Sequence, residues 1–232
     1  NGGIVLSISK LLFPEIKLNI KSKEVFSPVG VTLEDLRNKI LELSNNTLYY
    51  PVDPTSRHDA YVGGTLSCNA SGFIPGKRGA TRYWVNEIEL LLPNGYLIKA
   101  KRGNYISQNG VFQINVDNKY IVLPIPKYKR PKIKNASGPY SAHNGKIDFV
   151  DLIIGSEGIY GLITSCKLKV DSKPKDYLEL FLCLNNEEQA IDFHDYLYKK
   201  FDKDMSRISA LEYFGYNSQK YMKHKSFLFK KS

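Results

Sequence analysis

The sequence predicts an α+β protein, because helix-like and strand-like segments follow one another irregularly along its 232 residues. Two segments carry most of this prediction. Residues 31–43 place apolar side chains on one face of a helix, namely Leu33, Leu36, Ile40 and Leu43. Thr32 is suited to be the N-cap of this helix, with Asp35 three residues later. Residues 84–102 form two apolar runs around Asn94-Gly95, a pair typical of a hairpin turn.

The other N-terminal segments also read as strands and loops. The apolar run at 2–11 follows a glycine pair and predicts a buried strand. Residues 15–31 alternate between polar and apolar side chains, which predicts a hairpin. Residues 45–54 contain two prolines and predict a loop.

The C-terminal half is read in the same way. Residues 104–146 are less regular, and 149–170 predict a helix and a strand around a glycine-rich turn. A linker is expected at 172–175. After it, residues 177–184 predict a strand and residues 186–201 an amphipathic helix.

Composition limits the kinds of partner. The net charge of +10 favours polyanions, anionic lipid or a phosphate-bearing cofactor. The three cysteines, Cys68, Cys166 and Cys183, are too widely spaced for a disulfide framework or a CxxC metal site. We therefore expect a reduced, cytoplasmic setting. No run reaches the ~18 apolar residues of a membrane helix.

Several catalytic motifs are missing from the sequence. It contains no GxGxxG, no P-loop and no GxSxG nucleophile elbow. Its four histidines do not show HExxH or Cys/His zinc spacing. The sequence predicts no metal site.

Three stretches rich in small residues or turn formers remain: "PVDPTS" (51–56), "VGGTLSCNASG" (62–72) and "GSEGIYG" (155–161). Each offers backbone N–H groups with little side-chain bulk, which suits the binding of a diphosphate. Taken singly, each is better explained as a tight turn in a packed core.

In this order and spacing, the three stretches resemble the flavin domain of the vanillyl-alcohol oxidase and p-cresol methylhydroxylase superfamily. The branch they resemble most is that of the FAD-linked glycolate oxidases and D-lactate dehydrogenases. The resemblance covers about residues 2–170 and implies a two-subdomain α+β domain with FAD between the subdomains. It also implies hydride transfer from a substrate carbon to flavin N5. On this basis we expect an FAD-binding domain at 1–174 and the start of an α+β substrate-binding cap at 175–232.

The resemblance also implies the residues that bind the cofactor. The first stretch should lie along FAD, the glycine pair should let the backbone meet the diphosphate, and the third stretch should border the adenine, ribose or flavin ring. A further family element, read here as "KNASGPY", matches imperfectly and contributes a lysine. The implied set is Pro51, Asp53, Pro54, Thr55, Ser56, Gly63, Gly64, Cys68, Asn69, Ser71, Lys134, Glu157, Gly158, Gly161 and Ile163. No catalytic residue is implied within the chain.

The sequence departs from the family pattern at both ends. The family has a glycine-rich loop before the segment matching "GGIVLS", and a motif of histidines and glutamate near its C-terminus. Because neither stands in this sequence, we expect a chain truncated at both ends, which binds FAD weakly and does not turn over alone. Purified by itself, it should be largely colourless.

Individual residues also carry alternatives. Cys68 is interpreted as a small packed residue beside the cofactor rather than a redox thiol. His58 is expected to face solvent rather than tether the flavin, so FAD should be bound non-covalently. Trp84 is expected in the core. The basic run 127–134 is interpreted as a solvated loop, apart from the lysine of the family element.

We therefore expect an FAD-dependent oxidoreductase acting on a small 2-hydroxy acid such as D-lactate or glycolate, with an unspecified electron acceptor. One alternative is a non-catalytic flavin-binding partner of such an enzyme. A less favoured one is a basic polyanion-binding module, although no RNP, KH or helix-turn-helix pattern supports nucleic-acid binding. We expect a cytoplasmic protein with possible peripheral association at the inner face of the membrane.

Overall fold

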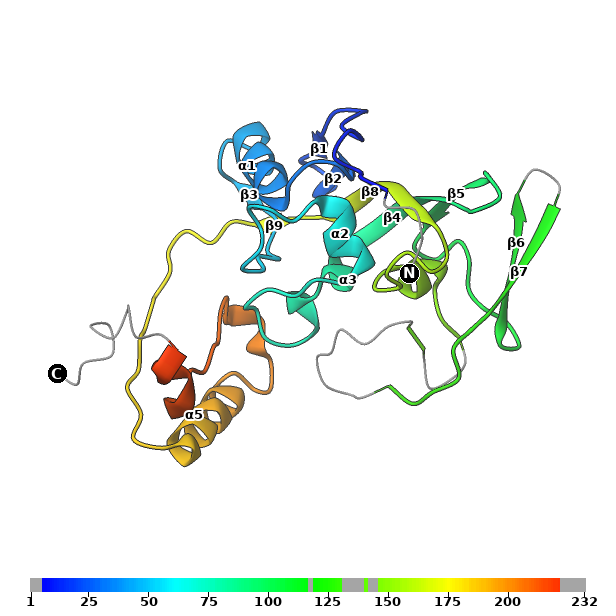
Figure 1. Ribbon diagram of the computed structural model, residues 1–232. Coiled ribbons are helices and arrows are strands. Elements are labelled where there is room, and N and C mark those ends of the chain that lie inside the picture. The colour runs from blue at the N-terminus through cyan, green and yellow to red at the C-terminus, as the bar shows by residue number, and fades with distance from the viewer. Residues whose placement is uncertain (1–5, 117–118, 131–139, 142–145, 222–232) are drawn as a thin grey trace. The chain divides into compact units, whose positions relative to one another are not determined.

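The computed structural model describes residues 6–116, 119–130, 140–141 and 146–221 (Figure 1). The chain divides into two compact units, the first made of residues 1–72 and 76–173 and the second of residues 73–75 and 174–232. The sequence segment expected to be a linker lies at this division. The roles expected for the two domains stay predictions.

The first unit is built on a five-stranded antiparallel sheet with the order β1-β2-β8-β4-β5. Its strands are β1 (Lys17–Asn19), β2 (Glu24–Pro28), β8 (Leu162–Lys169), β4 (Val85–Leu91) and β5 (Leu97–Lys101). Alternate residues of β4 and β5 are buried, as expected for a sheet with one covered face. Both predicted hairpins are confirmed, and Gly95 has φ 86° in the second turn.

Helix α1 (Leu33–Leu43) confirms the clearest helix prediction. Thr32 Oγ1 accepts a hydrogen bond from the Asp35 backbone N–H at 3.0 Å, which satisfies a free donor of the first turn. Three of its four apolar positions are buried, whereas Leu43 is 38% exposed at the helix end. The other helices of this unit are short: α2 (Val62–Ser67), α3 (Thr81–Trp84), α4 (Phe149–Ile153) and the 3₁₀ turn Lys77–Gly79.

A hairpin was missed within residues 104–146, which were interpreted as irregular. Strands β6 (Val111–Val116) and β7 (Lys119–Pro124) pair antiparallel. Phe112 of this hairpin is buried and meets Phe149 edge-to-face at 5.5 Å between ring centroids. A second short pair, β3 (Leu48–Tyr49) with β9 (Asp171–Ser172), lies within segments predicted to be loop and linker.

Two strand predictions are wrong over the described residues. Residues 6–10 contain no strand, and Leu6 is 66% exposed; residues 2–5 of that segment lie outside the described part. Residues 177–184 contain no strand either, and Leu178 is 84% exposed. A strand requires hydrogen bonds to a neighbour, and no described strand pairs with either segment.

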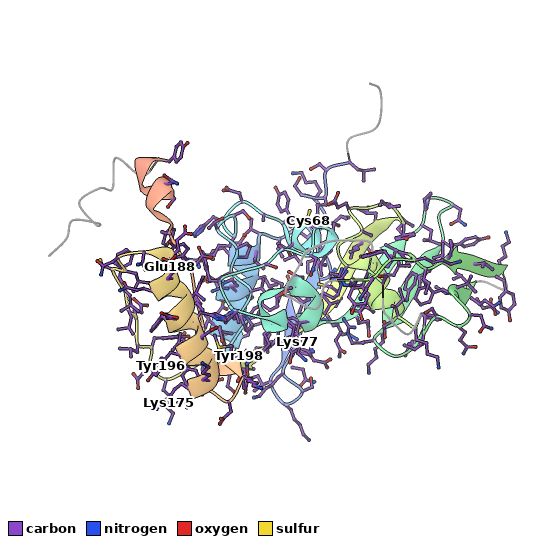
Figure 2. All side chains as sticks on the ribbon, turned by 90° about the horizontal axis from the view of Figure 1, so that it is seen from below. Cys68, Lys77, Lys175, Glu188, Tyr196 and Tyr198 are labelled. Carbon is purple, nitrogen blue, oxygen red and sulfur yellow. The ribbon has the colours of Figure 1, made fainter. Side chains whose placement is uncertain are left out.

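The second unit contains α5 (Glu187–Lys200) and the 3₁₀ turns Met205–Arg207 and Tyr216–Tyr221. The predicted helix is confirmed, with the Asn186 side chain accepting from the Gln189 N–H at 3.0 Å. No residue of α5 is buried, and Tyr196 and Tyr198 extend from it among exposed side chains (Figure 2). Within the described ranges, no helix has the length and apolar character needed to cross a membrane.

Candidate functional site

The glycine pair lies in a helix rather than in an open loop, which corrects the sequence interpretation. Residues 62–67 form α2, which is held to the end of β2 by backbone hydrogen bonds. The Gly63 N–H donates to Val29 O at 3.0 Å, and the Val62 N–H donates to Val31 O at 2.9 Å. The first turn of α2 is therefore fixed on the sheet.

The two glycines differ in what surrounds them. A Cβ on Gly63 would lie 2.7 Å from Ile8 Cδ1 and 2.9 Å from Val29 Cβ, so this position has no room for a side chain. A Cβ on Gly64 would have no atom within 4 Å. Packing within the protein therefore explains why residue 63 is a glycine. No described residue crowds Gly64, so packing does not explain the glycine at that position.

The turn at 155–161 also contains one glycine that is crowded by protein atoms and one that is not. Gly161 has φ 153°, and a Cβ there would collide with the carbonyl oxygen of Leu91. Gly158 has φ 79° and is exposed, with nothing closer to its Cβ position than 4.0 Å. Glu157 is also exposed and has φ 53°, a conformation uncommon for residues other than glycine.

Hydrogen bonds join this turn to the end of α2. The Gly155 N–H donates to Leu66 O at 3.0 Å, and the Glu157 N–H donates to Ser67 O at 2.9 Å. These bonds satisfy two carbonyls of the last helical turn. We call the joined segments, residues 61–69 and 155–161, the glycine wall.

One face of the glycine wall is exposed. Gly64 and Cys68 are one helical turn apart and are both exposed, as are Glu157 and Gly158. The thiol of Cys68 (labelled in Figure 2) is exposed, so it is not packed against other residues of the chain. Its packing beside the cofactor stays a prediction. The face presents small residues and backbone, which suits the close approach of a ligand.

The first predicted stretch lies beside the C-terminal end of the second. A Cβ on Gly72 would lie 2.6 Å from the backbone N of Asp53, so these two chain segments touch. The Asp53 carboxylate lies 3.6 Å from Arg57 Nη1 and 4.0 Å from Arg37 Nη2. Pro51 is buried, Pro54 is half-buried, and Thr55 and Ser56 are exposed.

The other residues predicted to bind the cofactor lie in the sheet, in an isolated bridge or in the buried interior, or are not described. Ile163 is 4% exposed and pairs with Leu90 in the sheet, and Ser71 forms an isolated bridge with Ala80. Asn69 is fully buried with φ 49°. Lys134 lies outside the described residues. Contact of any of these residues with a cofactor stays a prediction.

Sequence reasoning missed Arg82, a buried arginine of α3. It is 8% exposed, and its guanidinium donates through Nη2 to the Ile154 carbonyl, directly before the glycine-rich turn. Its backbone N–H donates to Asn69 Oδ1 at 2.9 Å. The tetrapeptide "TRYW" carries no local signal for this role, because the contacts join residues up to 72 positions apart.

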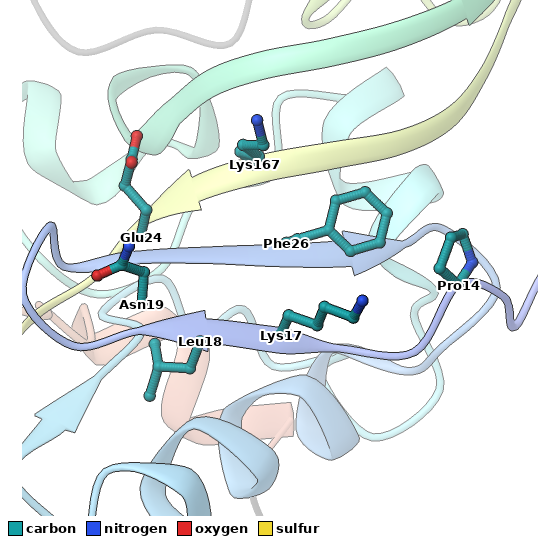
Figure 3. A pocket seen from close by; sticks show the side chains of 7 residues that line it. All are labelled: Pro14, Lys17, Leu18, Asn19, Glu24, Phe26 and Lys167. Carbon is teal, nitrogen blue, oxygen red and sulfur yellow. The ribbon is translucent and has the colours of Figure 1, made fainter.

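Other features of the described chain do not add to this site. Within the described ranges no group of three or more His, Cys, Asp or Glu side chains is placed to hold a metal ion. An open pocket of about 490 Å³ lies on β1, β2 and β8 (Figure 3). None of the predicted site residues lines it; its walls are Pro14, Lys17, Leu18, Asn19, Glu24, Phe26 and Lys167.

Comparison with known proteins places the N-terminal part of the chain beside a cofactor-binding family. Residues 1–101 match the family described as "FAD binding domain", and this range includes α2. A solved structure of alkyldihydroxyacetonephosphate synthase has a TM-score of 0.42 and 19% identity, covering 68% of this chain and 21% of that one.

Three curated relatives are D-2-hydroxy acid or glycolate enzymes by name. A D-lactate dehydrogenase of Anaerostipes hadrus is 31% identical over 82% of this chain and 31% of its own length. A D-2-hydroxyglutarate dehydrogenase of Xanthomonas citri pv. viticola is 25% identical over 92% of the chain and 36% of its own length. The glycolate oxidase protein GlcD of Bacillus subtilis is 25% identical over 70% and 26%.

The chain thus spans about a third of the length of these relatives. The resemblance predicted from the sequence motifs is confirmed by both the family match and the relatives. Residues 1–101 match the FAD binding domain family, and the chain is similar to D-lactate dehydrogenase, D-2-hydroxyglutarate dehydrogenase and the glycolate oxidase protein GlcD.

Proposed function

We propose that the protein containing this chain is an FAD-dependent oxidoreductase that oxidises a 2-hydroxy acid such as D-lactate or glycolate. The observation that carries the proposal is the exposed face of the glycine wall. Gly64 and Gly158 lie on this face without a side chain, although no neighbouring described residue would prevent one. Part of this wall lies in the residues that match the FAD binding domain family.

The residues of this face fit the phosphate-bearing part of a dinucleotide. Without a Cβ, the backbone at Gly64 and Gly158 can approach a diphosphate closely. The packed glycines beneath, Gly63 and Gly161, hold the backbone of the wall in place.

The substrate class is proposed from the names of the relatives, which include lactate, 2-hydroxyglutarate and glycolate enzymes. Bound FAD would supply a two-electron acceptor for the hydrogen removed from the hydroxyl-bearing carbon. We propose non-covalent binding, because the glycine wall presents backbone and small side chains and contains no histidine. A cytoplasmic location is proposed on the widely spaced cysteines alone.

Two measurements test the proposal. Titration of the 232-residue chain with FAD, followed by flavin fluorescence up to millimolar concentration, should show saturable binding. The complete protein should carry FAD, and anaerobic D-lactate or glycolate should bleach its flavin absorbance. A complete protein that purifies with bound flavin but is bleached by no 2-hydroxy acid would overturn the substrate class. A complete protein that does not bind FAD would overturn the whole proposal.

A further inference from the structure

Arg82 is a buried cation whose hydrogen-bonding capacity is only partly used. Its Nη2 donates to Ile154 O, whereas Nε is buried and has no hydrogen-bond partner among the described residues. No carboxylate of the described chain lies within ion-pair distance of its guanidinium. Burying a cation costs several kcal/mol unless a counter-charge and hydrogen bonds compensate it.

Arg102 offers a direct contrast in the same part of the fold. Its Nε donates to Val85 O at 3.0 Å, and its Nη2 donates to Arg82 O at 2.9 Å. Its Nη1 lies 2.8 Å from the Asp151 carboxylate. The guanidinium of Arg102 therefore has a direct ion pair, whereas that of Arg82 has none among the described residues and is only partly compensated by the more distant Asp151.

A second guanidinium lies close to Arg82. The Cζ atom of Arg82 lies 4.6 Å from the centroid of the Tyr140 ring, and that of Arg130 lies 4.2 Å from the same centroid. The ring attracts both cations, but the two cations repel each other. Burial and then the nearby Arg130 lower the pKa of Arg82 to about 10. An anion at this place would relieve both effects.

Asn69 adds a neutral donor to the same place. Its Oδ1 accepts from the Arg82 backbone N–H, whereas its Nδ2 is buried without a hydrogen-bond partner in the described part of the chain. A Cβ on Gly155 would lie 2.9 Å from Arg82 Nη2 and 3.0 Å from Asn69 Cβ, so the Arg82 guanidinium lies against Gly155 of the glycine wall and close to Asn69 of the same wall. The unused groups, Arg82 Nε and Asn69 Nδ2, are both donors, and donors require an oxygen acceptor.

We propose that Arg82 is the charged centre of an oxyanion-binding site beside the glycine wall, with Asn69 and Arg130 as supporting donors. The ligand is a carboxylate or phosphate group, because a guanidinium matches the paired oxygens of both. The 8% of Arg82 that is exposed is the route by which an oxygen reaches the site.

The proposed oxyanion site depends on the proposed function only for the identity of the molecule that carries the anionic group. Within that function, a carboxylate comes from the 2-hydroxy acid and a phosphate from the diphosphate of FAD. The two sources are distinguished by the probes: D-lactate and acetate for the carboxylate, inorganic phosphate and ADP for the phosphate.

The first test is protection of Arg82 from phenylglyoxal in the 232-residue chain, read by mass spectrometry of the peptides. A probe at ten times its Kd should slow modification of Arg82 about tenfold. Arg102 is the internal control, and its modification should be unchanged. Protection by the carboxylates alone assigns the substrate, and protection by the phosphates alone assigns the cofactor. Equal modification of Arg82 with and without all four probes, up to saturating concentration, would overturn the proposal.

The second test uses Arg82→Gln, which removes the charge, and Arg82→Lys, which keeps it. Addition of the protecting probe should raise the Tm of the wild-type chain and of Arg82→Lys, with a smaller rise for the lysine variant. The Tm of Arg82→Gln should not respond. Arg57→Gln is the matched control, since Arg57 pairs with Glu34 at 3.0 Å and should leave the response unchanged.

The Arg82→Gln variant loses the bond to Ile154 and can fail to fold; in that case protection of wild-type Arg82 decides the matter. An Arg82→Gln chain that folds and responds to the probe as the wild type does would contradict the proposal. This outcome is separate from failure of the proposed function, because anion binding is measured without FAD. A chain that binds the anion but not FAD would support the oxyanion site and contradict the proposed binding of FAD.

Discussion

The glycine wall contains two inner glycines, which face the protein, and two outer glycines, which face away from it. The two pairs lack a side chain for different reasons. On the inner side, Gly63 and Gly161 have no space for a Cβ, because protein atoms already occupy it. On the outer side, Gly64 and Gly158 face open space. The inner pair is explained by the fold alone, whereas for the outer pair we propose a ligand that approaches the backbone.

This difference gives an experimental criterion for function. A substitution at an inner glycine should lower the stability of the protein, and any effect on ligand binding should follow from that loss. A substitution at an outer glycine should cost no more stability than its backbone conformation requires and should act on binding directly. The following predictions test this separation, beginning with the largest expected effect.

Gly161→Ala should be the most damaging single change in the wall. The alanine would need an unfavourable φ of 153° and would collide with Leu91 O. Backbone strain and overpacking together should lower the free energy of unfolding by about 3–5 kcal/mol. Urea denaturation measures this loss. Gly158→Ala is the matched outer control, since it has positive φ but open space, and should cost only about 1–2 kcal/mol. Equal losses in the two variants would remove the distinction between inner and outer positions.

Gly63→Val should destabilise by about 1–3 kcal/mol, because the new side chain would press on Ile8 and Val29. Thermal unfolding of this variant should show a lower Tm than that of the wild type. A Tm equal to the wild-type value would show that the inner packing around α2 yields easily, which would contradict the account of Gly63.

Alkaline pH should weaken the core beneath the wall through Cys166. Burial raises the pKa of this thiol from 9.0 to about 12. Above pH 9.0 the unfolded chain therefore releases a proton that the folded chain keeps, and stability falls as pH rises. The slope should approach about 1.4 kcal/mol per pH unit.

The measurement compares urea midpoints between pH 9 and 10 for the wild type and Cys166→Ala. The burial of Tyr50 raises the pKa of its phenol from 10.0, so it adds a smaller fall in stability near pH 10. The lowered pKa of Arg82, about 10, acts in the opposite direction there, because the folded chain releases that proton before the unfolded chain does. The variant should be less stable throughout and should lose most of the pH slope. A slope that survives the substitution would assign the titration to another group.

Gly64→Ala should have the smallest effect on stability and should raise it. Alanine is favoured over glycine within a helix by about 0.8–1.0 kcal/mol, and its Cβ would meet no atom within 4 Å. The increase is measured by urea denaturation. A marked loss of stability would mean that the exposed face of α2 is covered by part of the protein.

Much of the first unit was predictable from local pattern. The spacing of Leu33, Leu36 and Ile40 indicated α1, and alternation around Asn94-Gly95 indicated the β4–β5 hairpin. The glycine pair was assigned to the correct motif but to the wrong conformation. Glycine disfavours helices, and only the hydrogen bonds from α2 to the end of β2 reveal why a helix forms there.

The remaining features depend on contacts distant in sequence. Residues 177–184 have the alternation of a strand but no described pairing partner, and alternation does not show whether a partner is present. The buried cation Arg82 depends on contacts with Asn69 and Ile154, which lie far from it in the chain. Sequence also cannot separate Gly63 from Gly64, because the difference lies only in what surrounds each one.

The central claim, that the outer face of the glycine wall receives the cofactor, is tested most directly by FAD affinity in Gly64→Val. The side chain would occupy open space on that face, with no protein atom within 4 Å of its Cβ position. We predict a fold as stable as the wild type to within about 1 kcal/mol and an FAD Kd raised at least about tenfold, equivalent to about 1.4 kcal/mol of binding free energy. A folded Gly64→Val chain with wild-type affinity for FAD would contradict the claim.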